Sequence, residues 1–308
     1  MLGAGLLLGT LGVPLEEAAQ HPLTAVWFRC AFATVALSLV LAVRGEWREL
    51  LIRGRSFGCA VASALLMLLN WWLFFESIRR TSIALATLVF HLQPFMVMAL
   101  GARWFGEPVR PSQWIAAAVA VVGLSLVVEL VPTLAGAGGL DASEAVGLAM
   151  CLGGAASYAL VVLLVKLAQS PVTARGGDRR AGRASPTGPL VLAWWQCAVG
   201  TACLAWWPAR HGLPGTPSAW AWLACLGVLN TGLAYALLYA GVARLSAARV
   251  AILQFVYPLA AVAVDGLVYG RVLGPVQLCG LGLMLGALFV AAAPPRAPRP
   301  DRPSGRRP

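Results

Sequence analysis

The stretch FESIRRTSIALATLVFHLQPFMVMALGARWFGEPVRPSQWIAAAVAVVGLSLVV, residues 75–128, decides the fold because the chain contains it twice. A second copy, YAGVARLSAARVAILQFVYPLAAVAVDGLVYGRVLGPVQLCGLGLMLGALFV, fills residues 239–290, at an offset of 164 residues. The positions that agree at that offset include Arg80 with Arg244, Ser82 with Ser246, Pro94 with Pro258, Gly106 with Gly270, Pro111 with Pro275 and Gln113 with Gln277. A shorter echo lies upstream, where Trp27-Phe28-Arg29-Cys30 is similar to Trp194-Trp195-Gln196-Cys197. The offset is close to half of the 308-residue chain, which predicts a tandem duplication.

The composition predicts an integral membrane protein. Hydrophobic residues make up 59% of the chain and charged residues 11%, whereas soluble domains have about 45–50% and about 25%. The net charge of +11 does not indicate nucleic-acid binding, because the basic residues lie in short segments between apolar stretches and in the C-terminal tail. The seven cysteines all lie in apolar segments without a CxxC pair, so we expect buried hydrophobes and predict neither a metal site nor a cofactor.

Ten apolar segments qualify as membrane-spanning helices by the criterion of about 20 mostly apolar residues. They lie at residues 1–18, 22–43, 57–78, 83–102, 111–131, 144–166, 189–207, 219–242, 247–269 and 275–293. The first is short, because only about 14 apolar residues precede Pro14-Leu15-Glu16-Glu17, enough for roughly 21 Å of a core of about 30 Å. Either the bilayer is thinner there or the chain begins further upstream.

Five helices in each half predict inverted repeats, because an odd number of spans makes the second copy enter the membrane in the opposite direction. The predicted fold is therefore an all-α polytopic membrane protein with ten transmembrane helices in two inverted five-helix repeats. We expect the first repeat at 1–131, an external connection at 132–143, and the second repeat at 144–293 with a basic cytoplasmic loop at 169–188. The Pro- and Arg-rich tail at 294–308 is expected to be disordered and cytoplasmic.

The basic residues predict the orientation. If the N-terminus is inside, the inner loops and tail hold 18 of the 23 Lys and Arg residues, while the outer loops hold only Arg79, Arg80, Arg210 and Arg271. The positive-inside rule then places both termini in the cytoplasm, with the chain in the inner or plasma membrane. The expected partners are the lipid bilayer and a small-molecule substrate, with the protein a monomer or a homodimer.

The order of these motifs resembles the EamA-type family of the drug/metabolite transporter superfamily. The resemblance is carried by LTAVWFRCAF at 23–32, by Thr81-Ser82-Ile83-Ala84-Leu85-Ala86 before a proline-containing helix, and by Gly106-Glu107-Pro108 followed by Gln113. Two positions of the second repeat depart from the family pattern: Gly270-Arg271 stands where Gly-Glu is common, and Gln196 replaces the arginine of repeat one.

The resemblance implies a secondary transporter, an exporter of a metabolite, amino acid or drug. A carrier of nucleotide sugars or lipid-linked molecules, from the same superfamily, and a non-transporting membrane scaffold or sensor are the alternatives. The sequence has no GxxxxGK[ST], HExxH or GxSxG motif, so we predict neither ATP-driven transport nor an enzyme.

The paired prolines point to the substrate path. Pro94 and Pro258 are expected to act as structural hinges, because each leaves the carbonyl four residues earlier without its helical donor, here those of Phe90 and Gln254. The expected pathway residues are Gln93, Tyr257, Asn70, His91, Gln254, Trp71, Tyr235 and Asn230. Polar contact between helices is the alternative role for Gln93, Tyr257 and Gln254.

Proton coupling is assigned to three residues in or near the membrane, His91, Glu76 and Asp265. A histidine bonded to a neighbouring helix and carboxylates solvated at the interface are the alternatives. Glu76 has Arg79 and Arg80 at ion-pairing spacing. Arg29, two turns inside its helix, is assigned a structural ion pair.

Other residues are expected to shape the helix bundle. Trp72 and Phe74 extend the predicted wall of Asn70 and Trp71, and Ser157 and Tyr158 are weaker candidates for it. Glu107-Pro108 is expected to close a turn. The GxxxG spacings Gly5/Gly9 and Gly282/Gly286 predict close helix contacts, or a dimer face.

Overall fold

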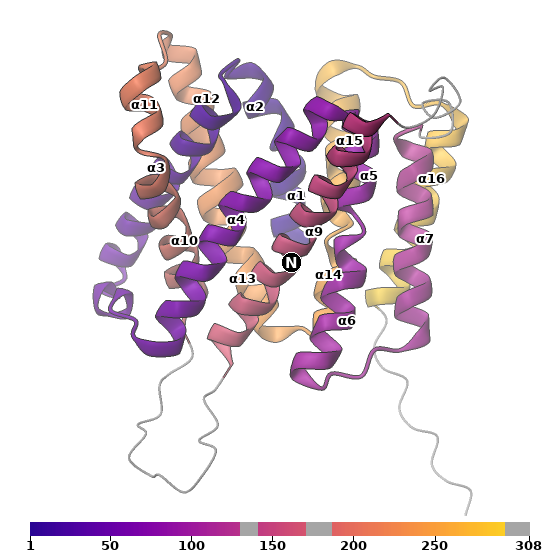
Figure 1. Cartoon of the computed structure of the whole chain (residues 1–308), viewed down its shortest axis with the longest axis horizontal. Helices are drawn as coiled ribbons and strands as arrows, with labels where there is room; N and C mark the ends of the chain where they lie inside the picture. Colours follow the sequence, from indigo (N-terminus) through magenta and orange to yellow (C-terminus); the bar gives the residue numbers. More distant parts are fainter. Residues whose placement is uncertain (130–140, 171–186, 293–308) are drawn as a thin grey trace, which may run out of the picture.

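The computed structural model describes residues 1–129, 141–170 and 187–292, and every regular element in these ranges is helical. Most of the connection predicted at 132–143, of the basic loop predicted at 169–188 and the whole of the tail predicted at 294–308 lie outside the described residues. The helices stand side by side in one bundle (Figure 1). The prediction of an all-α polytopic membrane protein agrees with this arrangement.

Seven segments of the described chain are long and apolar enough to cross a membrane. Three are single helices: α3 (Pro22–Val43), α4 (Gly54–Arg80) and α9 (Ala142–Gln169). Four are built from consecutive elements: α5 (Ile83–Phe90) with α6 (Gln93–Phe105), α10 (Pro189–Leu204) with α11 (Trp206–His211), α12 (Pro217–Gly227) with the π-helix η2 (Val228–Leu233) and α13 (Ala234–Arg244), and α14 (Ala247–Leu253) with α15 (Val256–Tyr269).

Shorter elements complete the bundle. They are α7 (Pro111–Val127), α16 (Pro275–Ala292), the 3₁₀ turn η1 (Trp47–Leu50), and the pair α1 (Leu2–Gly9) and α2 (Gly12–Glu17). The first predicted span is thus two short helices instead of one.

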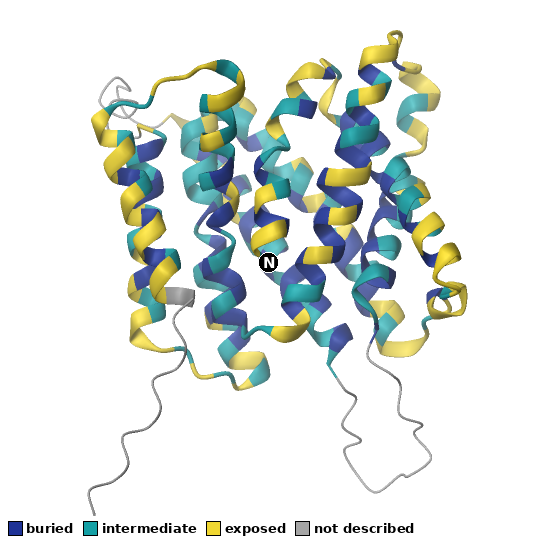
Figure 2. Ribbon diagram, turned by 180° about the vertical axis from the view of Figure 1, so that it is seen from behind, coloured by how far each residue is buried: buried dark blue, intermediate teal, exposed yellow. Residues whose placement is uncertain are grey.

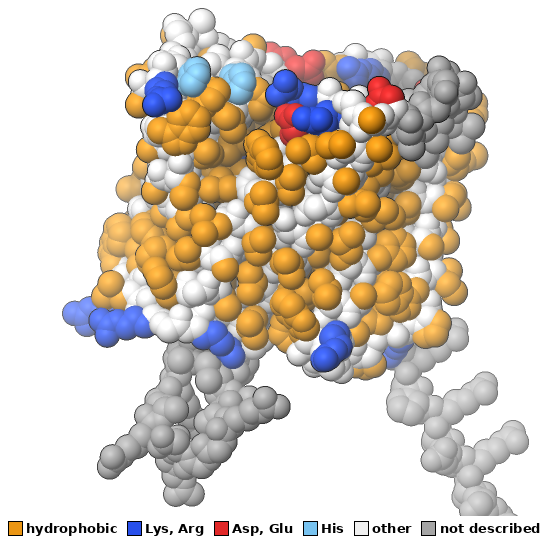
Figure 3. Space-filling model, viewed as in Figure 1, with side chains coloured by type: hydrophobic (Ala, Val, Ile, Leu, Met, Phe, Trp, Pro, Cys, Tyr) orange, Lys and Arg blue, Asp and Glu red, His pale blue; other side chains and the backbone are white. Residues whose placement is uncertain are grey.

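The surface matches a bilayer. Hydrophobic side chains form a broad band across the face of the molecule seen in Figure 3. The Lys, Arg, Asp, Glu and His side chains gather at the top and bottom of that face. Exposed positions recur along the outer helices while their inner faces are buried (Figure 2). We call the end formed by α2 and the last turn of α4 the α2 side, at the top of Figure 1, and the end where α14 begins the α14 side.

Both proline-containing spans break just before their proline. The break between α5 and α6 lies at His91-Leu92, and the break between α14 and α15 lies at Gln254-Phe255. The Gln254 carbonyl, predicted to lack its donor, accepts from the Tyr257 backbone N–H at 3.1 Å. A tighter turn therefore satisfies the group that the proline leaves free.

The two copies of the repeat build the same local structure. Ser82 and Ser246 cap α5 and α14 by accepting from the backbone N–H three residues ahead. Gly106 and Gly270 end α6 and α15 in the left-handed region, with φ of 64° and 65°, where glycine carries no steric cost.

The pair Gln113 and Gln277 shows the same equivalence in the first turn of the next helices, α7 and α16. The Oε1 atoms of Gln113 and Gln277 accept from Arg110 N and Gly274 N, each at 2.9 Å. The residues that agree between the copies thus fix the ends of the helices.

Helices of the two halves pack against each other across the bundle. The neighbouring pairs are α3 with α10, α7 with α16, α6 with α14, α4 with α9, and α1 with α15. The backbones of α7 and α16 approach closely, and a Cβ on Gly123 would lie 2.6 Å from the Gly280 carbonyl oxygen.

Of the two GxxxG spacings, only one makes the expected contact. Gly5 and Gly9 lie against α15, where added Cβ atoms would clash with Val256 and Ala260. Gly282 and Gly286 have open space within 4 Å, because Gly280, two residues earlier, occupies the face of α16 that meets α7. The prediction of a close contact at Gly282/Gly286 within the chain is wrong.

Candidate functional site

A cavity of about 380 Å³ lies between the two halves of the bundle. Its wall is formed by α1, α2, α3, α4, α5, α6, α9, α13, α14 and α15. Leu15, Pro22 and Ile78 line its part nearest the α2 side, so the cavity extends from the middle of the bundle towards that end. A volume of this size suits a small organic molecule.

The two broken spans meet at the cavity. The Gln93 Nε2 atom donates to the Gln254 Oε1 atom at 2.5 Å, which links α6 to the end of α14. His91 and Tyr257 also line the cavity, their rings parallel with centroids 6.3 Å apart. His91 Nδ1 lies 2.7 Å from the Thr87 carbonyl oxygen, one turn earlier in α5. All four pathway candidates of these spans therefore border one space.

The wall expected on α4 is present in part. Asn70, Trp71 and Phe74 line the cavity, and Asn70 is only 3% exposed. Trp72 does not belong to this wall: its side chain is 53% exposed, because one step along a helix turns it about 100° away from Trp71. Tyr235, from α13, also lines the cavity.

Three candidates lie away from this cavity. Asn230 in the π-helix donates to the Leu7 carbonyl at 2.6 Å and to Thr10 Oγ1 at 2.7 Å, so it bonds the break between α1 and α2. Glu76 makes the expected ion pairs with Arg79 and Arg80, at 3.1 and 3.0 Å.

The third of them, Asp265, pairs with Arg271 at 2.7 Å and lines a smaller pocket of about 220 Å³. Each of the three polar groups of Asn230, Glu76 and Asp265 thus has a partner within the protein. That smaller pocket also includes Gly9 and Ala261, which border the main cavity as well.

Arg29 was expected to form a structural ion pair, and the structure places it differently. It lines the cavity at 7% exposure, its Nε atom donates to Thr231 Oγ1 at 3.0 Å, and its guanidinium lies 4.6 Å from the centre of the Trp71 ring. Tyr158, only a weak candidate from sequence, also lines the cavity. An arginine inside an apolar span is itself the signal that could have marked this position.

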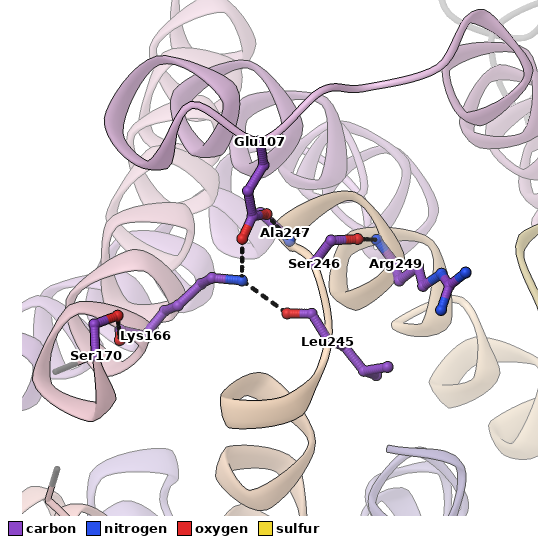
Figure 4. Close-up of polar contacts among 7 residues, drawn as sticks. All are labelled: Glu107, Lys166, Ser170, Leu245, Ser246, Ala247 and Arg249. Atoms are coloured by element: carbon purple, nitrogen blue, oxygen red, sulfur yellow. Dashed lines mark hydrogen bonds and ion pairs between the residues drawn. The ribbon is translucent and has the colours of Figure 1, made fainter. Parts of the chain in front are cut away.

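On the α14 side, a group of polar contacts joins parts of both halves (Figure 4). Glu107 Oε1 lies 2.6 Å from Lys166 Nζ, and Glu107 Oε2 accepts from the Ala247 backbone N–H at 2.6 Å. Lys166 Nζ also donates to the Leu245 carbonyl at 2.7 Å. We call Glu107, Lys166, Leu245 and Ala247 the α14-side cluster. Sequence analysis gave Glu107 only a turn-closing role, because its partners lie 59 and 140 residues away (Lys166 and Ala247).

Comparison with known proteins places this architecture in a family. Residues 1–129 and 145–293 each match the EamA-like transporter family. The chain belongs to the EamA-like transporter family. This confirms the resemblance to the drug/metabolite transporter superfamily, and it shows the chain to be a transporter-family, multi-pass membrane protein.

Curated relatives are similar over part or most of the chain. The uncharacterized transporter YxxF of Bacillus subtilis is 22% identical over 84% of this chain and 77% of its own length. Protein RarD of Streptomyces exfoliatus is 35% identical over 34% of this chain, and the match spans only 31% of that relative. A solved crystal structure shares the fold, with a TM-score of 0.76, 18% identity and coverage of 94% of both chains.

Proposed function

We propose that the chain is a secondary transporter that exports a small organic solute by alternating access between two inverted five-helix repeats. The observation that carries the proposal is the central cavity, which both halves line and which extends towards the α2 side. Equivalent helices of the halves pack in pairs, α3 with α10 and α7 with α16, as exchange of conformations between the repeats requires. The ten-span count is part of the same proposal.

The two ends of the bundle differ in a way that suits this mechanism. Glu107 joins three separate parts of the chain on the α14 side, whereas Arg271, at the equivalent place in repeat two, pairs with Asp265 of α15, the helix that ends just before it. With the N-terminus in the cytoplasm, the α2 side is external. In this proposed orientation, the cavity extends towards the outside and the α14-side cluster lies at the cytoplasmic end.

Release of solutes from proteoliposomes tests the proposal. Gly12 borders the cavity with open space around its Cβ position, so Gly12→Trp is expected to fill the cavity without a clash. Gly58, on α4 away from the cavity, has the same open space, and Gly58→Trp is the matched control. Vesicles are loaded with amino acids, nucleosides, aromatic acids and cationic dyes, and mass spectrometry measures their appearance outside.

At least one solute is expected to leave several-fold faster from vesicles holding wild type or Gly58→Trp than from vesicles holding Gly12→Trp. Equal release of every solute from all three preparations would contradict a carrier and favour a scaffold or sensor. Vesicles with one orientation of the protein, separated by protease access, give the direction.

The Gln93–Gln254 bond gives a prediction on stability. Gln93→Leu leaves the Gln254 amide buried without its partner, which costs roughly 1–3 kcal/mol, whereas replacing both by leucine removes the polar pair and is nearly neutral. We therefore expect each single variant to unfold at a lower temperature than the double variant, in a double-mutant cycle followed by thermal unfolding in detergent. Additive losses would show that the two amides do not act together.

A further inference from the structure

Among the described side chains that line the cavity, that of Arg29 is the one with a fixed charge. Charged side chains in membrane-spanning segments are rare, and they face the bundle interior or a wet cavity and pair with another group. Arg29 lies on α3 seven residues after Pro22, is 7% exposed, and borders the cavity. Its position therefore raises the question of what neutralises the guanidinium.

Neutral groups are the partners of Arg29 within the described chain. Thr231 accepts from the Nε atom at 3.0 Å, and the Trp71 ring lies under the guanidinium at 4.6 Å. Across residues 1–129, 141–170 and 187–292, the ion pairs involve Arg44, Arg79, Arg80, Lys166 and Arg271, and not Arg29. Among the described residues that line the cavity there is neither Asp nor Glu.

The N–H donors of the Arg29 guanidinium that can still bond a ligand have a fixed geometry. Thr231 takes the Nε hydrogen and the Tyr235 hydroxyl, also neutral, bonds the guanidinium, which leaves three of the five N–H donors on the fork of terminal nitrogens. Such a fork matches the two oxygens of a carboxylate, and a charged hydrogen bond of this kind is about twice as strong as a neutral one. The cation–π contact with the Trp71 ring helps to hold the guanidinium of Arg29 in place.

Two further polar groups point to a ligand in the same space. Asn70 Oδ1 and Gln93 Oε1 are buried and have no hydrogen-bond partner among the described residues, although both residues border the cavity at 3% and 2% exposure. Buried amides are nearly always bonded, so water or a bound solute is needed to satisfy them.

The remaining wall favours an apolar body. Six of the lining side chains are aromatic besides Trp71: Phe74, Phe75, Phe90, Tyr158, Tyr235 and Tyr257. Aromatic walls with few polar groups are typical of sites for small organic molecules, and 380 Å³ is near the lower end of their range of about 300–1,000 Å³.

We propose that the cavity binds a small organic anion, with its carboxylate on Arg29 and an apolar or aromatic body against the ring-lined wall. This inference rests on the proposed function in taking the cavity as the transport site. The unpaired oxygens of Asn70 and Gln93 only accept, so they bond water or a donor on the body of the solute and not its carboxylate, and the described lining residues offer no carboxylate for an ammonium group.

Matched ligands test the charge requirement on the unmodified full-length protein. Binding is measured by thermal shift and calorimetry in detergent at pH 7.5, where carboxylic acids are ionised. The probes are benzoate, 3-phenylpropionate and indole-3-acetate, each beside its neutral amide of the same shape, together with phenylalanine as the zwitterion. At least one carboxylate is expected to bind ten-fold or more tightly than its amide, and at least as tightly as phenylalanine.

Two substitutions locate the charge. Arg29→Gln is expected to reduce the preference for carboxylate over amide at least ten-fold, while Arg210→Gln, at the α2 side and outside the cavity, leaves it unchanged. Arg29→Lys, which keeps the charge and loses the fork, is expected to retain part of the preference. The ligand series on wild type decides the question if Arg29→Gln does not fold.

Three results would overturn the inference: no carboxylate binds, an amide binds as tightly as its acid, or Arg29→Gln keeps the full preference. Tighter binding of phenylalanine than of 3-phenylpropionate by ten-fold would also overturn it, because the ammonium would then be recognised. These binding results can be told apart from a failure of the proposed transport function. Release of neutral or cationic solutes from the vesicles above would show transport without a preference for anions.

Discussion

Replacing Gly123 with leucine is expected to separate α7 from α16 and to destabilise the whole bundle. A Cβ atom at Gly123 would lie 2.6 Å from the Gly280 carbonyl oxygen and 2.8 Å from Met284 Cγ, so the helices cannot keep their distance. Overpacking of a filled interior costs typically 1–3 kcal/mol, and a clash with backbone leaves no side chain free to move aside. In membranes, where helices associate through close packing, small residues at such crossings are the main contact.

Thermal unfolding and size-exclusion chromatography in detergent check this result. Gly282→Leu is the matched control, because Gly282 lies on α16 only two residues from Gly280 and its Cβ position is open. We expect Gly123→Leu to unfold at a clearly lower temperature, Gly123→Ala at an intermediate one, and Gly282→Leu like wild type. A loss with Gly282→Leu equal to that with Gly123→Leu would contradict the assigned contact.

The repeat explains why so much of the fold could be predicted from sequence. Residues that agree between the copies, such as Ser82 with Ser246 and Gly106 with Gly270, act locally, as helix caps and left-handed ends. Local roles depend on neighbours along the chain, so spacing and residue type are enough to identify them. The helix breaks before Pro94 and Pro258 follow from the same local rules.

Contacts between distant segments were harder to predict. Which of two GxxxG-like faces meets a neighbour depends on the rotation of α16, and a shift of two residues moved the contact from Gly282 to Gly280. Trp72 was wrongly assigned to the cavity for the same reason, because the rotation of α4 is set by packing. Asn230 looked like a pathway residue, yet it bonds Leu7 and Thr10, more than 200 residues away along the chain.

Loss of the Glu107 carboxylate is expected to open the α14 side and, as a consequence, to close the α2 side. Glu107 bonds Lys166 of α9 and the first residue of α14, Ala247, and the two charged side chains are only 24% and 12% exposed. A hydrogen bond to a charged group contributes roughly 1.5–3 kcal/mol. Removing these bonds weakens the contacts that hold this end together, so the proposed alternating access predicts a shift towards a state that is open there.

Hydrogen exchange measured by mass spectrometry separates this effect from a local one. In Glu107→Ala we expect amides at 103–110 and 244–250 to exchange at least ten-fold faster, and amides at 10–25 on the opposite side to become more protected. Glu107→Gln keeps an oxygen for Ala247 N–H and loses the charge, so a smaller change in the same direction is expected.

Glu76→Ala is the matched control for Glu107→Ala. Glu76 is also a carboxylate with two cationic partners, but Arg79 and Arg80 belong to its own helix, α4. Its loss is expected to change exchange only around the end of α4, because the pair joins no separate parts of the bundle. If Glu107→Ala likewise changes only the residues around it, the α14-side cluster caps a helix and does not hold one end of the transporter closed. Opposite changes at the two ends, present in Glu107→Ala and absent in Glu76→Ala, require the two ends to be coupled through the bundle, as alternating access demands.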